Sequence, residues 1–455
     1  MTMTRIYIIY ICKYYNRMSK FLFYGCWNNI NCDKEYVYRD LVLSYIKKKE
    51  KGLSTFLIAG DNWYSTKLLD KETNVTTQYY LLSILKTGYD KIYSLNKTIH
   101  VAAGNHDEET DGEKPPKSIK NRCMIKTQKK YIDTLNEANN VSLNYSKDSI
   151  TYDKYMQDSD EMTSSSFIES DLNGFQPTLE ELEEIKNIDI HNKTINLYVD
   201  DIGIVNNEKY IVIIINTNKL NNDDYMNDIK RTFQEISDSN ATGKQIFVMG
   251  HVPLFPIKKD KIKKKDKDPL FGKGDMLFDL LAEYKYIYLC ADSHYFSIME
   301  ISKNDKTVIQ ITSGTGGADP DINTEKYEDT INVKQKEYNI KYYLLNSYGY
   351  SIIRIYKHKI IIIYKKIINA NNGDDASSNK GGNAYLYSIQ RDNGNIKFEK
   401  SSSIKQVFSD KKFEQYKSDK YLTCNHINQQ MLTIEDNVVT SEDKNTFCYK
   451  KIKDK

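Results

Sequence analysis

Polar side chains that suit metal-ion chemistry gather in four short turns of the 455-residue sequence. The turns read GDNWY (60–64), GNHDE (104–108), GHVPLF (250–255) and ADSHYF (291–296), and they hold three of the seven histidines. Their candidate functional residues are Asp61, Tyr64, Asn105, His106, Asp107, His251, Asp292 and His294. Carboxylate, phenolate, amide and imidazole groups brought together could hold two cations, with one carboxylate bridging them and open positions left for phosphate and hydroxide.

Each turn follows a segment that the sequence predicts to be a β-strand. Strands are expected at 20–25, 54–59, 98–103, 194–200, 209–218, 244–250, 285–290, 297–302 and 307–318, with a hairpin at 348–365. Helical periodicity at 33–52, 76–89, 221–238 and 274–284 alternates with the earlier strands, as in βαβ units. Because ligands of such sheets bind at the carboxyl ends of the strands, we expect the four turns to converge on one site.

The composition is that of a globular protein, with 40% hydrophobic residues. Lys and Arg total 65 against 62 Asp and Glu, which gives a net charge of +3. Because these charges nearly balance, the chain has no overall positive electrostatic field that would attract nucleic acid, and nucleic acid is not an expected partner. The sequence predicts a 1–18 N-terminal extension, a 19–368 domain with a polar insertion at about 108–190, and a 369–455 C-terminal extension. The insertion could recruit a protein partner.

The cysteines and the N-terminus bear on the cellular compartment. The seven cysteines are odd in number and scattered: Cys12, Cys26, Cys32, Cys123, Cys290, Cys424 and Cys448. They predict a reducing compartment without a disulfide framework. The apolar run at 6–12 is too short to span a membrane, and no small-residue cleavage site follows it. We expect a mature N-terminus at or near Met18, because the first strand-like segment begins directly after it. We therefore expect a soluble, intracellular protein without a membrane partner.

The four turns resemble four of the five signature blocks of the calcineurin-like metallophosphoesterase superfamily. Tyr64 resembles the tyrosine of its purple acid phosphatase branch. The resemblance implies an α/β fold with two mixed β-sheets packed face to face and flanked by helices. It also implies hydrolysis of a phosphate-ester substrate by metal-bound hydroxide at a binuclear site.

The resemblance implies a role for each metal ligand. Asp61 would bridge two metal ions, and Tyr64 and His294 would bind the first, which is ferric iron in the purple acid phosphatase branch. Asn105 and His251 would bind the second ion, which is Zn, Mn or Fe. Among the remaining candidates, His106 would be catalytic and would stabilise or protonate the leaving-group oxygen, with Asp107 orienting it.

Two residues depart from the family pattern. Asp292 stands where the last block has its first histidine, and a carboxylate there can still coordinate Mn, Mg or Fe. Cys26, in Gly-Cys-Trp-Asn (25–28), stands where the first block has an aspartate ligand. Cys26 could be a thiolate ligand or a small buried thiol in a lost site. Asn28 could supply an amide oxygen instead, whereas Trp27 is most simply a packing residue.

Two other functions remain open from the sequence. A degenerate member of the family could bind phosphate or protein without catalysis, because the missing aspartate weakens one metal position. A phosphodiesterase or nuclease is favoured by the lysines of 257–269 but not by the balanced overall charge. The glycine-rich stretch 313–321 resembles a phosphate-binding loop in shape but lacks the lysine of a P-loop.

Overall fold

A computed structural model of the chain describes a β-rich molecule. The described residues are 19–29, 38–64, 85, 87–108, 125, 128–129, 131–137, 193–257, 270, 273–321, 326–333, 338–356, 359–369, 383–392, 395–400 and 405–406. None of the helices in these ranges is long and apolar enough to cross a membrane. The expected N-terminal extension, most of the polar insertion and most of 257–269 lie outside these ranges.

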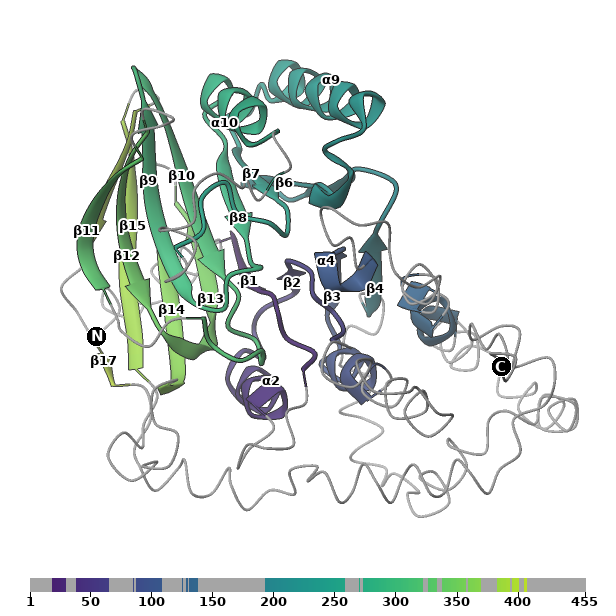
Figure 1. Cartoon of the computed structure of the whole chain (residues 1–455). Helices are drawn as coiled ribbons and strands as arrows, with labels where there is room; N and C mark the ends of the chain where they lie inside the picture. The colour runs from purple at the N-terminus through teal and green to yellow at the C-terminus, as the bar shows by residue number, and fades with distance from the viewer. Residues whose placement is uncertain are drawn as a thin grey trace, which may run out of the picture.

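Two mixed β-sheets pack face to face (Figure 1). The first has the order β16 (Asn395–Lys400), β15 (Asn383–Asp392), β14 (Lys359–Asn369), β13 (Ser347–Ile355), β1 (Ser19–Tyr24), β2 (Thr55–Ile58), β3 (Thr98–Ala102) and β4 (Thr194–Tyr198), and β17 (Lys405–Gln406) pairs with β15. The second has the order β11 (Lys326–Val333), β12 (Tyr338–Leu345), β9 (Phe296–Lys303), β10 (Lys306–Ser313), β8 (Ile287–Cys290), β7 (Gln245–Met249), β6 (Tyr210–Ile214) and β5 (Gly203–Asn206).

The central strands of each sheet run parallel, which brings their carboxyl ends to one edge. In the first sheet β1, β2, β3 and β4 are parallel, and the register pairs Tyr24 with Ile58 and Ile58 with Val101. In the second sheet β6, β7, β8 and β10 are parallel. The turns after these strands therefore lie side by side, as the ligand-binding edge of an α/β sheet requires.

Alternation along β1 shows how the layers are packed. Phe21 and Phe23 belong to the apolar core between the sheets, where the ring of Phe21 meets Phe247 edge-on at 5.3 Å. Leu22 and Tyr24 point to the opposite face and pack in the core under helix α2 (Tyr38–Lys49). This period of two is the pattern of a strand buried on both faces.

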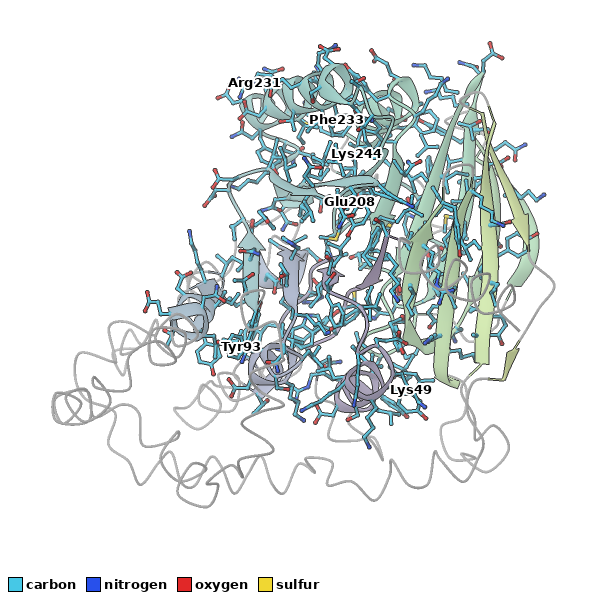
Figure 2. The ribbon with its side chains drawn as sticks, turned by 180° about the vertical axis from the view of Figure 1, so that it is seen from behind. Lys49, Tyr93, Glu208, Arg231, Phe233 and Lys244 are labelled. Carbon is cyan, nitrogen blue, oxygen red and sulfur yellow. The ribbon has the colours of Figure 1, made fainter. Side chains whose placement is uncertain are left out.

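Helices α9 (Asp223–Ser239) and α10 (Gly274–Glu283) cover the outer face of the second sheet (Figure 1). Asn222 caps the N-terminus of helix α9, and its side chain accepts a hydrogen bond from the backbone N–H of Tyr225 at 3.1 Å. Phe233 is fully buried on the side of α9 that faces the sheet, whereas Arg231 on its outer side is 68% exposed (Figure 2). The molecule is thus layered as helices, sheet, sheet and helices.

These layers confirm the fold class predicted from the sequence, α/β with two mixed β-sheets packed face to face and flanked by helices. Strands β5, β11 and β12 were not predicted, because lysine, asparagine and acidic residues interrupt their apolar pattern. The first sheet also continues past residue 369, where we expected a C-terminal extension, since β15, β16 and β17 add to it. The domain boundaries themselves stay a prediction.

Candidate metal centre

Three candidate ligands share an unusual backbone conformation just beyond the ends of parallel strands. Cys26 after β1, Asp61 after β2 and Asp292 after β8 have φ values of +50°, +52° and +48°. The left-handed region costs a non-glycine residue on the order of 1–3 kcal/mol and persists only where the surroundings impose it. The surrounding turns therefore impose this conformation on all three residues.

Glycine makes room for the central carboxylate. A Cβ atom on Gly104 would lie 2.1 Å from the backbone nitrogen of Asp61 and 2.3 Å from its Oδ1. Gly60, with φ +82°, would place a Cβ atom 2.6 Å from Nδ1 of His251. The glycines of GDNWY and GNHDE thus allow two strand-end turns to approach closely.

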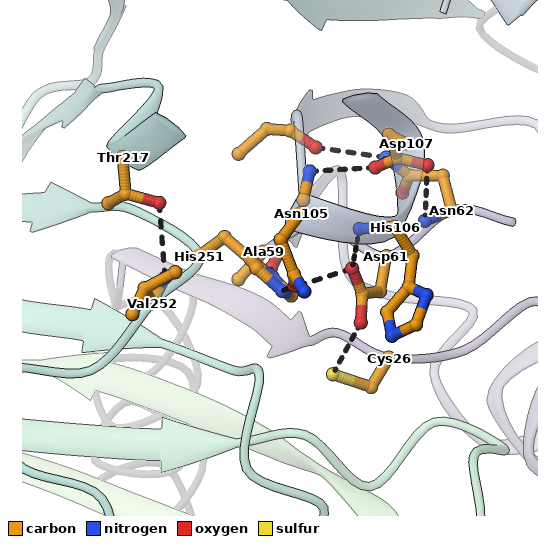
Figure 3. Close-up of polar contacts among 12 residues, drawn as sticks. Cys26, Ala59, Asp61, Asn62, Asn105, His106, Asp107, Thr217, His251 and Val252 are labelled. Carbon is orange, nitrogen blue, oxygen red and sulfur yellow. Dashed lines mark hydrogen bonds and ion pairs between the residues drawn. The ribbon is translucent and has the colours of Figure 1, made fainter. Parts of the chain in front are cut away.

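Asp61 lies at the centre of the site and divides it into two sides (Figure 3). Its Oδ2 accepts hydrogen bonds from the Tyr64 hydroxyl at 2.8 Å and from the Cys26 thiol at 3.8 Å. Its Oδ1 lies 3.0 Å from Nε2 of His251 and accepts the backbone N–H of His106 at 3.1 Å. A buried carboxylate whose two oxygens face two different groups of ligands has the arrangement of a bridging ligand.

The first group of ligands surrounds Oδ2. Ligand atoms of Cys26, Asp61 and His294 all lie within 4.8 Å of one another. Nδ1 of His294 lies 2.6 Å from the carbonyl oxygen of Asp319, which orients the ring. Its Nε2 lies 3.3 Å from the oxygen of Tyr64, whose hydroxyl donates to Asp61. Thiol, carboxylate, phenol and imidazole groups therefore surround one position that could hold a cation.

The second group surrounds Oδ1. Nδ1 of His251 lies 2.6 Å from the carbonyl oxygen of Ala59, and Nε2 lies 2.8 Å from Oδ1 of Asn105 and 3.0 Å from Asp61. Both ring nitrogens of His251 therefore face acceptors, so the imidazole is held as a cation. The proton on Nε2 lies between His251, Asn105 and Asp61, at the position that a metal ion would take. These three residues therefore fit a metal-binding site.

The pKa values of the central pair follow from this arrangement. Burial alone would lower the pKa of His251, but the charge and hydrogen bond of Asp61, with the charge of Asp292, raise it to about 9. Burial opposes ionisation of Asp61, yet the attraction of His251 and His106 and the hydrogen bonds from His251 and Tyr64 hold the pKa of that carboxyl well below its usual range. Asp292 is half-buried, and its negative charge contributes to the raised pKa of His251 in the second group of ligands.

Asp107 does not have the contact that we predicted for it. Instead of orienting His106, its fully buried carboxylate accepts four N–H donors. They are the backbone N–H and side-chain amide of Asn62, the backbone N–H of Gly104 and the side-chain amide of Gln128, at 2.7–2.9 Å. Burial and the charge of Asp61 raise the pKa of Asp107 to about 7, but four donors are satisfied only by the carboxylate. Asp107 therefore ties together the turns that carry Asp61 and Asn105.

Asn28 does not supply an amide oxygen to the cluster. Its Oδ1 accepts Nη1 of Arg39 at 2.7 Å, and its Nδ2 donates to the carbonyl oxygen of Asn62 at 2.8 Å. Trp27 is fully buried, meets the ring of Tyr89 edge-on at 5.8 Å and donates Nε1 to Oδ1 of Asn62 at 3.0 Å. Trp27 thus packs as predicted and also supports the Asp61 turn.

Two aspartates of the glycine-rich stretch 313–321 were missed from the sequence. The carbonyl oxygen of Asp319 fixes the His294 ring, and Oδ2 of Asp321 accepts the backbone N–H of His294 at 2.9 Å. Gly314 lets this stretch pass close to the cluster, because a Cβ atom there would lie 2.1 Å from the carbonyl oxygen of Ser293. The sequence feature that could have indicated these two residues is the Asp-Pro-Asp sequence directly after a predicted strand.

Comparison with known proteins agrees with the class of protein that the fold and the clustered ligands define, the metallophosphoesterases. The chain matches the family model described as calcineurin-like phosphoesterase over residues 19–296. The chain therefore belongs to the calcineurin-like phosphoesterase family.

Two similar solved structures share little sequence with the chain. A purple acid phosphatase from yellow lupin (Lupinus luteus) seeds has 11% identity and a TM-score of 0.48, with 83% of this chain and 54% of that chain covered. A structure of PhoD has 8% identity and a TM-score of 0.45, with 92% and 78% covered. This chain thus spans about half the length of the purple acid phosphatase. No curated protein sequence matches it.

The close approach at Gly104 leads to a first prediction. Gly104→Ala is expected to lower hydrolysis by about a hundredfold, because the backbone of Asp61 must move and a misplacement of about 1 Å has such an effect. Metal content should fall in parallel. Gly243→Ala is the matched control: Gly243 also has a positive φ, but no described atom lies within 4 Å of its Cβ position. It should cost about 1 kcal/mol of stability without affecting metal content, and equal metal loss in both variants would contradict the prediction.

Proposed function

We propose that the protein hydrolyses a phosphate ester with two metal ions held at the strand ends. The observation that carries this proposal is the division of ligands by Asp61, whose Oδ2 faces Cys26 and Tyr64 while Oδ1 faces His251. A single carboxylate between two ligand groups is the arrangement that a two-metal hydrolase needs. Family membership supports the class of reaction.

The described side chains could hold the two ions as follows. The first would be bound by Asp61, Tyr64, His294 and Cys26, and the second by Asp61, Asn105, His251 and Asp292. When bound, the ions would polarise the phosphate, activate a water molecule and neutralise charge that develops in the transition state. Both histidines would bind through Nε2, since their Nδ1 atoms face backbone carbonyl oxygens.

His106 is the proposed proton donor to the leaving group. Its backbone N–H is fixed on Asp61, and its ring lies against Tyr64 with centroids 4.7 Å apart. Within the described residues the ring itself makes no hydrogen bond and is partly exposed, so it can hold a proton for a substrate oxygen. Asp107 supports it only indirectly, through the turn that carries both residues.

More specifically, the proposed enzyme is similar to a purple acid phosphatase, with iron at the first metal position and zinc, manganese or iron at the second. It is supported by Tyr64, which lies 3.3 Å from Nε2 of His294 and is oriented to the same carboxylate oxygen as Cys26. An aryl phosphate monoester and the corresponding diester, tested side by side, separate this form from a phosphodiesterase. We expect turnover of the monoester in a preparation with two metals per chain, and no turnover would favour a non-catalytic binding protein.

Tyr64→Phe tests the position of the iron. A tyrosinate bound to ferric iron gives visible absorption, so the iron-loaded protein should be coloured and the substitution should remove its long-wavelength band. The Phe ring keeps the packing against His106, so the fold and the iron content should change little. Tyr198→Phe is the matched control, since Tyr198 bonds His100 on the neighbouring strand and lies outside both ligand groups. A band that survives in Tyr64→Phe would contradict this assignment.

A further inference from the structure

We infer that Cys26 binds the first metal ion as a thiolate, so that this position selects zinc or iron over magnesium and manganese. The inference rests on the proposed function and gives the reason for the departure of the first turn from the family pattern. It requires that Sγ be directed at the other ligands, that the turn be held there, and that sulfur change the preference for metals.

In the turn that presents Cys26, the backbone N–H and carbonyl groups of Gly25 and Cys26 are all hydrogen-bonded. The N–H of Cys26 donates to the carbonyl oxygen of Gly60 at 3.0 Å, and its own carbonyl oxygen accepts Ala318 N–H at 3.0 Å. The preceding Gly25 donates to Ser313 at 2.8 Å. Cysteine has no special preference for a positive φ, whereas aspartate is enriched there. The conformation is therefore imposed by the surrounding strands, and it directs Sγ as it would direct a carboxylate.

The surroundings of Sγ are those of a ligand. It lies 3.8 Å from Oδ2 of Asp61, and ligand atoms of Cys26, Asp61 and His294 form the one such group found among the described residues. Cys290 is the contrasting buried cysteine. Its Sγ contacts the hydroxyl of Thr312 at 3.4 Å and the carbonyl oxygen of Ile311 at 3.8 Å, with no carboxylate or imidazole ligand in such a group. Burial alone therefore does not account for the position of Cys26.

A thiolate changes which ions the site prefers. Zinc and iron bind thiolate together with imidazole and carboxylate, whereas magnesium and manganese prefer oxygen ligands. The thiol proton leaves when the metal binds, so the charge supplied by Cys26 equals that of the aspartate it replaces. The first metal position thus keeps the negative charge of its ligands but changes its preference among metals. A site that had lost this ligand would show neither property.

Cobalt(II) is a direct probe, because a thiolate bound to it gives an intense near-ultraviolet charge-transfer band. The full-length protein, freed of metal and titrated with cobalt, should show this band, and Cys26→Ser and Cys26→Asp should lack it. Cys290→Ser is the matched control and should keep it. In competition titrations the preference for zinc over manganese should fall at least about tenfold in Cys26→Asp. The aspartate suits the left-handed turn, so this variant is expected to fold.

The outcomes separate this inference from the proposed function. A thiolate band without turnover of any phosphate ester supports the inference and contradicts the function. Turnover with two metals per chain but an unchanged cobalt spectrum in Cys26→Ser contradicts the inference and leaves the function intact. An equal zinc preference in the wild type and Cys26→Asp would also overturn the inference, as would failure of the wild type to bind cobalt or zinc.

Discussion

Asp61→Asn is expected to abolish hydrolysis, lowering kcat/KM by at least about a thousandfold. The carboxylate contacts both ligand groups, with Oδ2 facing Cys26 and Tyr64 and Oδ1 facing His251. An amide has one oxygen and no charge, so it cannot join two cations. Steady-state hydrolysis of an aryl phosphate, with metal content measured on the same preparation, gives the result, and we expect both metals to be lost together.

The control is a carboxylate that carries no such role. Asp279 is 50% exposed and pairs with Lys306 at 2.7 Å on the surface, so Asp279→Asn should leave kcat/KM and metal content unchanged. If Asp61→Asn lost only one metal, or kept activity within about tenfold of the wild type, the bridging role of Asp61 would be wrong.

Asp107→Asn is expected to lower the free energy of unfolding by about 3 kcal/mol, a large effect for a change of one atom. Each carboxylate oxygen accepts two N–H donors, from Asn62 and Gln128 on Oδ1 and from Asn62 and Gly104 on Oδ2. In either orientation the new amide N–H₂ group would face two donors. Rotation of the Gln128 amide does not repair this, since its Oε1 already accepts the hydroxyl of Tyr89 at 2.9 Å.

Chemical denaturation of metal-free protein measures this effect without a contribution from metal binding. Glu235→Gln on α9 is the matched control, because Glu235 is 69% exposed and its contact with Arg231 is 3.9 Å long. The control should change stability by no more than about 0.5 kcal/mol. If Asp107→Asn were equally mild, the four hydrogen bonds would not hold the two turns as described.

Local patterns made much of the site predictable from the sequence. GDNWY and GNHDE each follow an apolar run, and parallel strands must bring the residues after such runs to one edge. The structure accordingly places His294 in one ligand group with Asp61 and Cys26, and His251 beside Oδ1 of Asp61. The alternation of strands and helices indicated an α/β fold, and the resemblance to the family implied its two face-to-face sheets.

The contacts that depend on distant parts of the chain could not be predicted in this way. Asp107 meets Gln128 across a stretch that reads as polar insertion, and its four donors replace the expected contact with His106. His294 is held by Asp319 and Asp321, which lie beyond both strands that follow it, β9 and β10. No periodic pattern encodes these pairings, because they depend on how loops from different strands meet.

The number of metal ions per chain tests the account most directly. Full-length protein reconstituted with zinc or iron and freed of excess metal should contain two ions per chain by elemental analysis and should hydrolyse an aryl phosphate. Asp61→Asn, prepared in parallel, should contain none. One ion per chain in the wild type, or none, together with no turnover, would contradict a two-metal phosphoesterase.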